Sequence, residues 1–272
     1  MRIKQAAFGT VGMVALTAAL ALGEPPWKLP AGTTVIDHGT RTYRFTVEYS
    51  TANTRGDVMG RQRLTGEYTR GLPDNEAVWN RVTLEEATGA TAPYGEPSNQ
   101  SFMDGFRYRN DLSETMKPGL FKGFPPQAVI DKNLVWDAGM IELFGQTQFD
   151  HLQLNRPYTL IANKEANMPD VGTFTNRNVV LEWVGNSERN GEECAIITYK
   201  AFFNALDVDA GGLKLKGRSN YWGEIWVSRK TRQIEYSTIY EDVLGELKLP
   251  GQEASQVVNV FRAGTFAPVS HK

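Results

Sequence analysis

The sequence contains one cysteine and three histidines in 272 residues, and this scarcity excludes several kinds of chemistry. With Cys194 alone, no disulfide can form within the chain, so the fold must depend on its hydrophobic core. Cys194 lies in a strand-like run, where we expect a small buried hydrophobic residue rather than a nucleophile. A zinc site needs three or four ligands on one frame, and only Asp37–His38 and Asp150–His151 offer adjacent pairs. We therefore expect no metal and no cofactor.

Signature motifs of several enzyme classes are also missing. The sequence has no G-x-S-x-G, no P-loop and no dinucleotide-binding glycine fingerprint. The run Asp207–Gly212 resembles the opening of a calcium loop, but Arg218 stands where the bidentate glutamate belongs, so we interpret it as a hairpin turn. Lipase-like and nucleotide-dependent activities thus lose their usual sequence support.

Clusters of basic residues are absent, although the chain has 29 basic and 31 acidic residues. Nucleic-acid binding needs a clustered basic surface, and a polybasic membrane anchor needs a basic run. The net charge of −2 at pH 7 favours neither. We expect no nucleic-acid partner.

The N-terminus has the pattern of a signal peptide. A basic start, Met1–Lys4, precedes an apolar run over Ala6–Leu22, and small residues lead to Gly23. We predict cleavage after Gly23, which makes residues 1–23 the leader and gives a periplasmic or secreted mature chain with no transmembrane segment. An uncleaved anchor is the alternative, but the run is shorter than the roughly 20 residues that a membrane-spanning helix needs. No cysteine follows the run, so a lipid-modified N-terminus is not expected.

Strand patterns occur in two clusters, residues 41–84 and 179–262. The clearest is the alternation of Tyr43, Phe45, Val47 and Tyr49 with polar residues. We predict a mainly β fold, a single curved antiparallel sheet or open half-barrel, with one or two inserted helices. The mature chain would form one β-rich domain, residues 24–272, with a helical and loop insertion at about 89–178.

Within the insertion, three segments have recognisable patterns. Asp111 to Glu114 has the form of a capping box and predicts a short helix. Apolar residues at helical spacing predict a helix within 137–152. Residues 163–178 are polar and contain Pro169 and Gly172, so we predict an irregular connection there.

The segment from Gly217 to Leu247 predicts a long hairpin whose turn places Ser228 opposite Gln233 and Trp226 opposite Glu235. In this register one face carries Tyr221, Ile225, Val227, Ile234, Tyr236 and Tyr240. The other carries Trp222, Glu224, Trp226, Glu235, Ser237 and Ile239. Two indoles beside two carboxylates are too apolar for bare solvent and too charged for a sealed core, so we expect protein or ligand to cover this second face.

The hairpin also carries a family resemblance. Gly223–Ser228 followed by Thr231–Tyr236 resembles the strand, turn and returning strand of LolA-like and LppX-like envelope proteins. The resemblance implies a curved antiparallel sheet closed by helices over an apolar cavity, and carriage of lipid or lipoprotein. The missing lipid-modified cysteine departs from the lipoprotein members, and no site residue of the family can be transferred.

We therefore expect an exported, non-enzymatic protein that binds a hydrophobic or amphiphilic ligand, or another envelope component. The predicted helical segment, together with the Phe-rich stretch at Phe121 and Phe124, would act as a lid over the ligand. The candidate ligand-binding residues are Tyr221, Trp222, Trp226, Tyr236, Phe144 and Phe121. Two alternatives stay open. One is a secreted carbohydrate-active hydrolase that uses Glu224 and Glu235 as paired carboxylates. The other is an envelope interaction protein with no small ligand.

Overall fold

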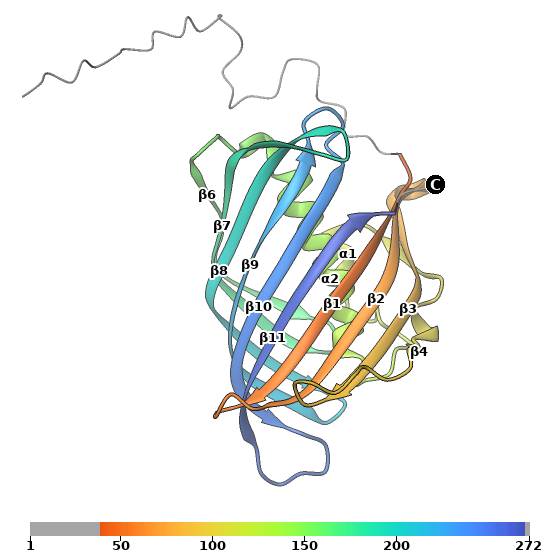
Figure 1. Cartoon of the computed structure of the whole chain (residues 1–272), viewed down its shortest axis with the longest axis vertical. Coiled ribbons are helices and arrows are strands. Elements are labelled where there is room, and N and C mark those ends of the chain that lie inside the picture. Colours follow the sequence, from red (N-terminus) through yellow and green to blue (C-terminus); the bar gives the residue numbers. More distant parts are fainter. Residues whose placement is uncertain (1–38, 270–272) are drawn as a thin grey trace, which may run out of the picture.

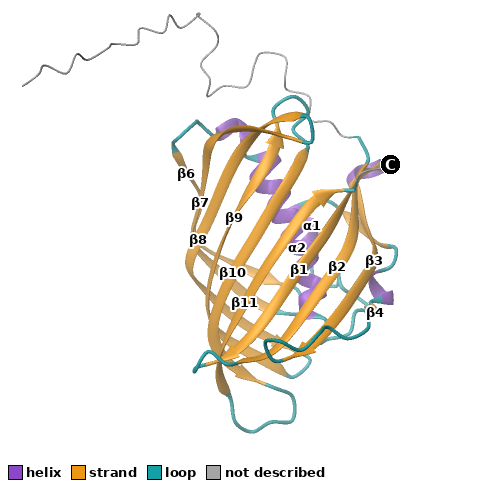
Figure 2. Cartoon of the chain, in the orientation of Figure 1, coloured by secondary structure: helices purple, strands orange, loops and turns teal. Residues whose placement is uncertain are grey.

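The structure, a computed structural model, describes residues 39–269, except for the side chain of Leu112, and its strands form one open antiparallel sheet (Figures 1 and 2). This confirms the predicted mainly β architecture. The predicted leader, residues 1–23, lies outside the described residues, as do Asp37 and His38. The predicted domain boundaries stay a prediction.

The sheet joins the two predicted strand clusters through the first and last long strands of the chain. Its order is β4-β3-β2-β1-β11-β10-β9-β8-β7-β6, and β5 also pairs with β3. Phe45 of β1 faces Phe266 of β11 at this junction. The described strands are β1 (Arg41–Asn53), β2 (Val58–Leu72), β3 (Glu76–Thr88), β4 (Ser98–Asn99), β5 (Phe106–Arg109), β6 (Pro157–Met168), β7 (Gly172–Arg189), β8 (Glu192–Ala210), β9 (Leu213–Ser228), β10 (Ile234–Lys248) and β11 (Gln256–Pro268).

The helices lie between β5 and β6 and cover the concave side of the sheet (Figures 1 and 2). The predicted capping box forms the short helix α1 (Leu112–Thr115), where the Asp111 carboxylate accepts the Ser113 amide at 2.9 Å. The long helix α2 (Val129–Glu142) continues into a π-helical turn, η3 (Leu143–Thr147), and a 3-10 turn, η4 (Phe149–His151). Short 3-10 turns also stand at Pro73–Asn75 (η1) and Ser101–Met103 (η2). Among the described residues, no helix has the length and apolar character needed to cross a membrane.

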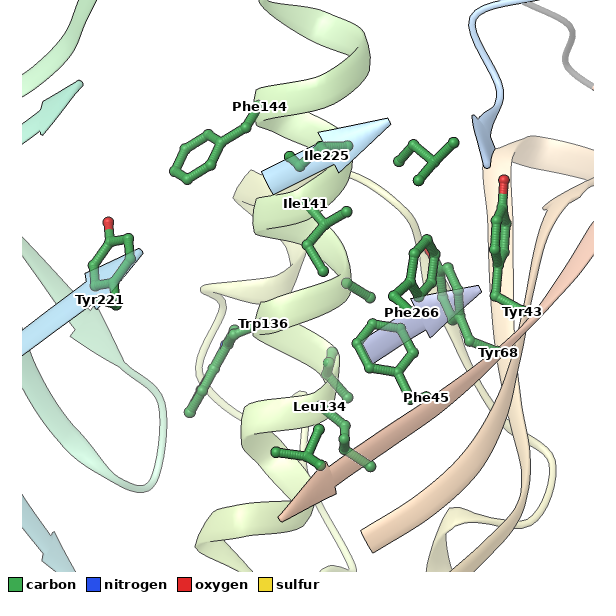
Figure 3. Close-up of a cluster of buried hydrophobic side chains, with 14 of the residues drawn as sticks. Tyr43, Phe45, Tyr68, Leu134, Trp136, Ile141, Phe144, Tyr221, Ile225 and Phe266 are labelled. Atoms are coloured by element: carbon green, nitrogen blue, oxygen red, sulfur yellow. The ribbon is translucent and has the colours of Figure 1, made fainter. Parts of the chain in front are cut away.

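Helix α2 passes between two parts of the curved sheet, which pack on it from different sides. Figure 3 shows Leu134 and Ile141 of α2 facing a group of rings that includes Phe45 and Phe266, while Tyr221 of β9 lies on the other side of the helix. Phe45 and Phe266 have ring centroids 4.4 Å apart and are fully buried. Because side chains of a strand alternate faces, the alternating apolar residues of β1 all enter this core.

Two sequence predictions in the insertion need correction. The long helix begins at Val129, before the predicted segment 137–152. The sequence pattern missed its first half because the buried residues there include charged ones, such as Asp131 and Lys132, which hide the apolar periodicity. The predicted polar connection at 163–178 is wrong, since these residues form the hairpin of β6 and β7. Most side chains of β6 are exposed or half-buried, so this edge strand lacks the alternation that identifies a half-buried strand.

The central hairpin forms with a β-bulge that the sequence did not predict. Ser228 does face Gln233, as predicted, with its amide donating to the Gln233 carbonyl at 2.8 Å. However, Trp226 pairs with Tyr236 instead of Glu235, which is the extra residue of the bulge. An extra residue turns every following side chain to the other face of the sheet.

The bulge therefore changes which residues of β10 share a face with the tryptophans. Ser237 and Ile239 are buried on the concave side, whereas Tyr236 and Tyr240 accompany Trp226 and Trp222 on the convex side. The predicted assignment of these four β10 residues is wrong for this reason. The predicted face of β9 holds.

Candidate functional site

The structure divides the six predicted ligand-binding residues between the two faces of the sheet. Tyr221 lies on the concave face, and Phe144 and Phe121 reach that side from the helical segment. The convex face carries the other three, Trp222, Trp226 and Tyr236. A single ligand cannot contact both sets, so each face has to be considered by itself.

On the concave face, aromatic side chains form a continuous wall from the helix to a half-buried position on β7. Phe144 of η3 lies 5.3 Å from Tyr199 of β8, between ring centroids. Tyr199 lies 6.3 Å from Tyr221 of β9, and Tyr221 lies 6.2 Å from Phe174 of β7. The Tyr221 hydroxyl donates to the Asn176 side chain at 2.9 Å, so the wall also carries a polar group. We call these four aromatic residues the concave aromatic wall.

Two glycines make room for this wall. A Cβ at Gly223 would overlap the Thr238 carbonyl oxygen and the Tyr199 hydroxyl, which donates to that same carbonyl at 2.8 Å. At Gly145 a Cβ would lie 2.9 Å from a methyl group of Ile225. The backbone of the helical segment therefore packs directly against the Ile225 side chain of β9. The wall and the helix are therefore in close contact without a gap at these points.

Phe121 belongs to a different cluster, at the other side of α2. Its ring is 5.3 Å from Trp136 of α2 in an edge-on arrangement. The Trp136 indole donates to the Thr115 carbonyl at 3.1 Å. Other rings in the cluster are Phe102, Phe106 and Phe124. These contacts fasten the segment before α2 to the helix.

Helix α2 is also held to the sheet by buried ion pairs. Asp137 accepts from Arg262 of β11 at 2.7 Å, and the same guanidinium lies 2.6 Å from Glu241 of β10. Ser219 of β9 donates to Glu241 as well. Burial raises the pKa of Asp137 to about 6, and the nearby Arg262 only partly opposes this rise. Arg262 is thus the counter-ion of two buried carboxylates, Asp137 and Glu241.

A second ion pair holds the C-terminal end of α2. Glu142 lies 2.8 Å from Arg70 of β2 and accepts from the Tyr68 hydroxyl at 2.9 Å. Burial, followed by the neighbouring Glu142 charge, raises the pKa of Tyr68 well above its ordinary value. Beyond the helix, Arg232 donates to Asp150 of η4. The helical segment is therefore bound to the sheet by directional polar contacts at several points along its length.

The two carboxylates of the hydrolase alternative each accept hydrogen bonds from other side chains. Glu224 is on the convex face, where it accepts from the Trp226 indole at 3.0 Å. Glu235, in the bulge, accepts both terminal nitrogens of Arg41 at 2.8 and 2.7 Å and is 3% exposed. Glycoside hydrolysis needs two carboxylates across one cleft. Their catalytic role stays a prediction.

Metal ligands and a reactive thiol are equally hard to find within residues 39–269. No group of three or more histidine, cysteine, aspartate or glutamate side chains is close enough to hold a metal ion in this range. Cys194 is buried, as predicted, and burial raises the pKa of its thiol to about 11. This thiol is therefore protonated at neutral pH.

The sequence did not predict two surface hollows near β1, β2 and β3. The first, about 510 Å³, is lined by the ends of these strands, among them Tyr49, Met59 and Glu86, and by Ala92, Pro93 and Gly95. The second, about 560 Å³, is polar and includes Arg44, Glu67 and Arg81. In the second hollow, Glu67 bridges both arginines at 2.9 and 2.7 Å. The polar side chains there already satisfy one another.

Comparisons with known proteins assign neither a family nor a function to this chain. No protein-family model matches this chain, and so no family match supports the resemblance to LolA-like and LppX-like proteins. No curated protein matches it. Among solved structures, one reported as "Lipid-protein interactions in lipovitellin" is similar with a TM-score of 0.39 and 13% sequence identity over 85% of this chain. The match covers 25% of the lipovitellin chain, and at this TM-score it carries no argument about function.

Proposed function

We propose that this protein is an exported, non-enzymatic binding protein for a hydrophobic or amphiphilic ligand. The ligand would lie on the concave face, between β7 to β9 and the helical segment, residues 112–151. The concave aromatic wall is the observation that supports this proposal. It leads from half-buried Phe174 to Phe144 at the helix, and a largely apolar surface with few polar groups is the usual lining of such sites.

The polar contacts of the wall suit an amphiphile better than a pure hydrocarbon. The Tyr221 hydroxyl and the Asn176 side chain form one hydrogen-bonded pair beside Phe174. A ligand head group would exchange hydrogen bonds with this pair, while its apolar part would lie against the rings of Tyr199 and Phe144. Export is proposed from the predicted leader.

Entry of a ligand would require the helical segment to move away from β8 and β9. At the Gly145 contact the interaction is apolar, whereas Asp137 and Glu142 hold the helix through Arg262 of β11 and Arg70 of β2. We propose that the helix stays attached to β2 and β11 by these ion pairs and separates from β8 and β9. The segment would then act as a hinged lid.

The first test is native mass spectrometry of protein purified from its own host, with analysis of the organic extract of the same sample. A stoichiometric apolar adduct is expected. A clean mass with an empty extract would count against the proposal.

The second test is titration with a pyrene-labelled fatty acid. Phe174→Ser removes the accessible end of the wall and should weaken binding about tenfold, from the apolar area lost to the ligand. Phe261→Ser, a matched change on the convex face, should leave the affinity unchanged. Equal affinities of all three proteins would remove the concave wall from the binding site.

A further inference from the structure

The outer end of the concave aromatic wall lies beside a lysine of the edge strand β6. Lys164 of β6 pairs in register with Asn176 of β7. Directly paired residues of antiparallel strands lie on one face, with side chains about 5 Å apart. Lys164 therefore shares the concave face with Asn176, whose side chain accepts the Tyr221 hydroxyl at 2.9 Å. Lys164 is exposed, and its ammonium has no ion pair or hydrogen bond within residues 39–269.

The surface next to Lys164 on the concave face is uncharged. Towards the turn of the β6–β7 hairpin, Ala166 pairs with Phe174 and Met168 pairs with Gly172. The half-buried rings of Phe174 and Tyr221 lie 6.2 Å apart, between centroids. A positive charge thus stands at one end of an aromatic and apolar surface, which is the arrangement that an amphiphile with a negative head group would match.

The charged residues that follow Lys164 and Asn176 in the chain do not cancel this positive charge. Glu165 pairs with Thr175 and lies on the opposite face of the hairpin, since neighbouring side chains of a strand alternate. Arg177 is a second cation without an ion pair in the described part of the chain, and it donates to an asparagine side chain at 3.5 Å. The charges nearest to the Asn176 side chain are therefore predominantly positive.

Two other carboxylates in this region already have a cation beside them. Asp170 lies in the turn of the hairpin, where the buried ammonium of Lys132 donates to the Asp170 carbonyl at 3.3 Å. Glu241, which is buried near Tyr221, lies 2.6 Å from Arg262. Neither carboxylate forms an ion pair with Lys164, so the lysine is available to a ligand.

The Asn176 side chain can supply further hydrogen-bond donors at the same point. Its oxygen accepts the Tyr221 hydroxyl, so the two hydrogens of its nitrogen are left without an acceptor among residues 39–269. Burial, followed by the charge of Glu241, raises the pKa of the Tyr221 hydroxyl, which therefore stays protonated and keeps Asn176 in this orientation. An anion between Lys164 and Asn176 would accept from an ammonium and from an amide.

We propose that the ligand of the concave aromatic wall carries an anionic head group, which Lys164 and the Asn176 amide bind. This inference rests on the function proposed above and names the ligand class: an apolar chain with a carboxylate or phosphate at one end. The chain would lie against Tyr199 and Phe144. Lys164 would determine which head group is preferred and contribute little of the total affinity, because an exposed ion pair is weak compared with burial of an apolar chain.

The test compares pyrene-labelled ligands that share one chain and differ in the head group: a carboxylic acid, a phosphate, an alcohol and an amine. The wild type should bind the acid and the phosphate about fivefold more tightly than the alcohol, as expected for one exposed ion pair. The amine should bind more weakly than the alcohol. Raising the salt concentration should reduce the preference for the anions, because salt screens exposed charges.

Variants of Lys164 separate the head group from the rest of the site. Lys164→Gln should lower the affinity for both anions about fivefold and leave the affinity for the alcohol unchanged, whereas Lys164→Arg should keep the preference. Lys200→Gln is the matched control, at an exposed lysine of β8 that pairs with Trp222 on the convex face, and should bind all four ligands like the wild type. The Lys164 variants should melt at the wild-type temperature, because this side chain makes no contact that supports the fold.

The outcomes distinguish this inference from the function on which it rests. If the wild type binds the alcohol as tightly as the acid and the phosphate, the anionic head group is refuted and the binding function stands. If Lys164→Gln and Lys200→Gln weaken anion binding equally, net charge rather than this contact decides, and the inference is again refuted. Binding of none of the four ligands would overturn the proposed function as well. An anion preference that Lys164→Gln alone removes supports the inference, and the tighter of the two anions identifies the head group.

Discussion

Replacing Asp137 by asparagine should remove part of the pH dependence of the unfolding free energy. Asp137 is buried between α2 and the sheet, shares Arg262 with Glu241, and has a pKa raised to about 6 from 3.8. In the unfolded chain the carboxyl returns to the lower value. The folded state therefore binds the extra proton between about pH 4 and pH 6.

The sign of the effect follows from this proton. The protonated carboxyl is favoured in the folded state, so its stabilising contribution is complete below pH 4 and is lost as the pH rises through 6. A rise of about two pKa units corresponds to about 3 kcal/mol of unfolding free energy. The amide introduced by Asp137→Asn would be uncharged at every pH and would leave Arg262 with Glu241 as a neutral pair. The variant should therefore match the wild type near pH 4 and gain about 3 kcal/mol relative to it by pH 7, because the raised pKa already includes the opposing attraction of Arg262.

Urea unfolding of both proteins, followed by tryptophan fluorescence at a series of pH values, measures this difference. Asp131, whose pKa burial also raises to about 6, contributes equally to both proteins and cancels in the comparison. If the difference in unfolding free energy between the two proteins does not change from pH 4 to pH 7, Asp137 is not desolvated in the folded state. If the variant instead loses relative stability as the pH rises, the attraction of Arg262 outweighs burial, and the assignment of the shift is wrong.

Four further outcomes test the packing. Arg262→Gln leaves two buried carboxylates without a counter-ion and should cost about 3–5 kcal/mol at pH 7, and less at pH 4, in the same unfolding assay; an equal cost at both values would contradict the buried charges. Gly223→Ala should lower the melting temperature strongly, because its Cβ overlaps the Thr238 carbonyl, and a neutral effect would refute that close approach. Phe203→Gly should gain about 1 kcal/mol, a rise of about 2–4 °C in melting temperature, since φ strain is relieved and little buried area is lost; a fall would mean that the ring packs. Cys194 should resist iodoacetamide at pH 8 until the protein unfolds, and rapid labelling of the native protein, read by mass, would argue against its burial.

The strands of the core were predictable because they are half-buried. In β1, Tyr43, Phe45, Val47 and Tyr49 face the core and their neighbours face outward, so a period of two is visible in the sequence. In β6 most side chains are exposed or half-buried, and the same signal is absent. Helix α2 was placed too late because it is buried on several sides and carries charges that the sheet neutralises.

The candidate site was only partly predictable. Phe144 and Tyr221 were recognised as large apolar residues of a helix and a strand, but nothing local connects them to Tyr199 or Phe174. Those contacts depend on how β7, β8 and β9 curve around η3. The exposed ring of Phe203 was missed because a bulge, rather than the residue type, turns it outward.

By itself, the amino-acid sequence determined what local periodicity and composition control: a mainly β chain with an antiparallel sheet, an inserted helical segment, and an aromatic hairpin at 217–247. The tertiary structure decided which face of that hairpin meets the helix. Glu235 occupies its bulge beside Arg41, which lies 194 positions earlier in the chain, and this bulge reverses the faces of the residues that follow. Alternation along a strand is a local property, whereas a register shift stabilised by a distant ion pair exists only after β1 and β10 have come together in one sheet.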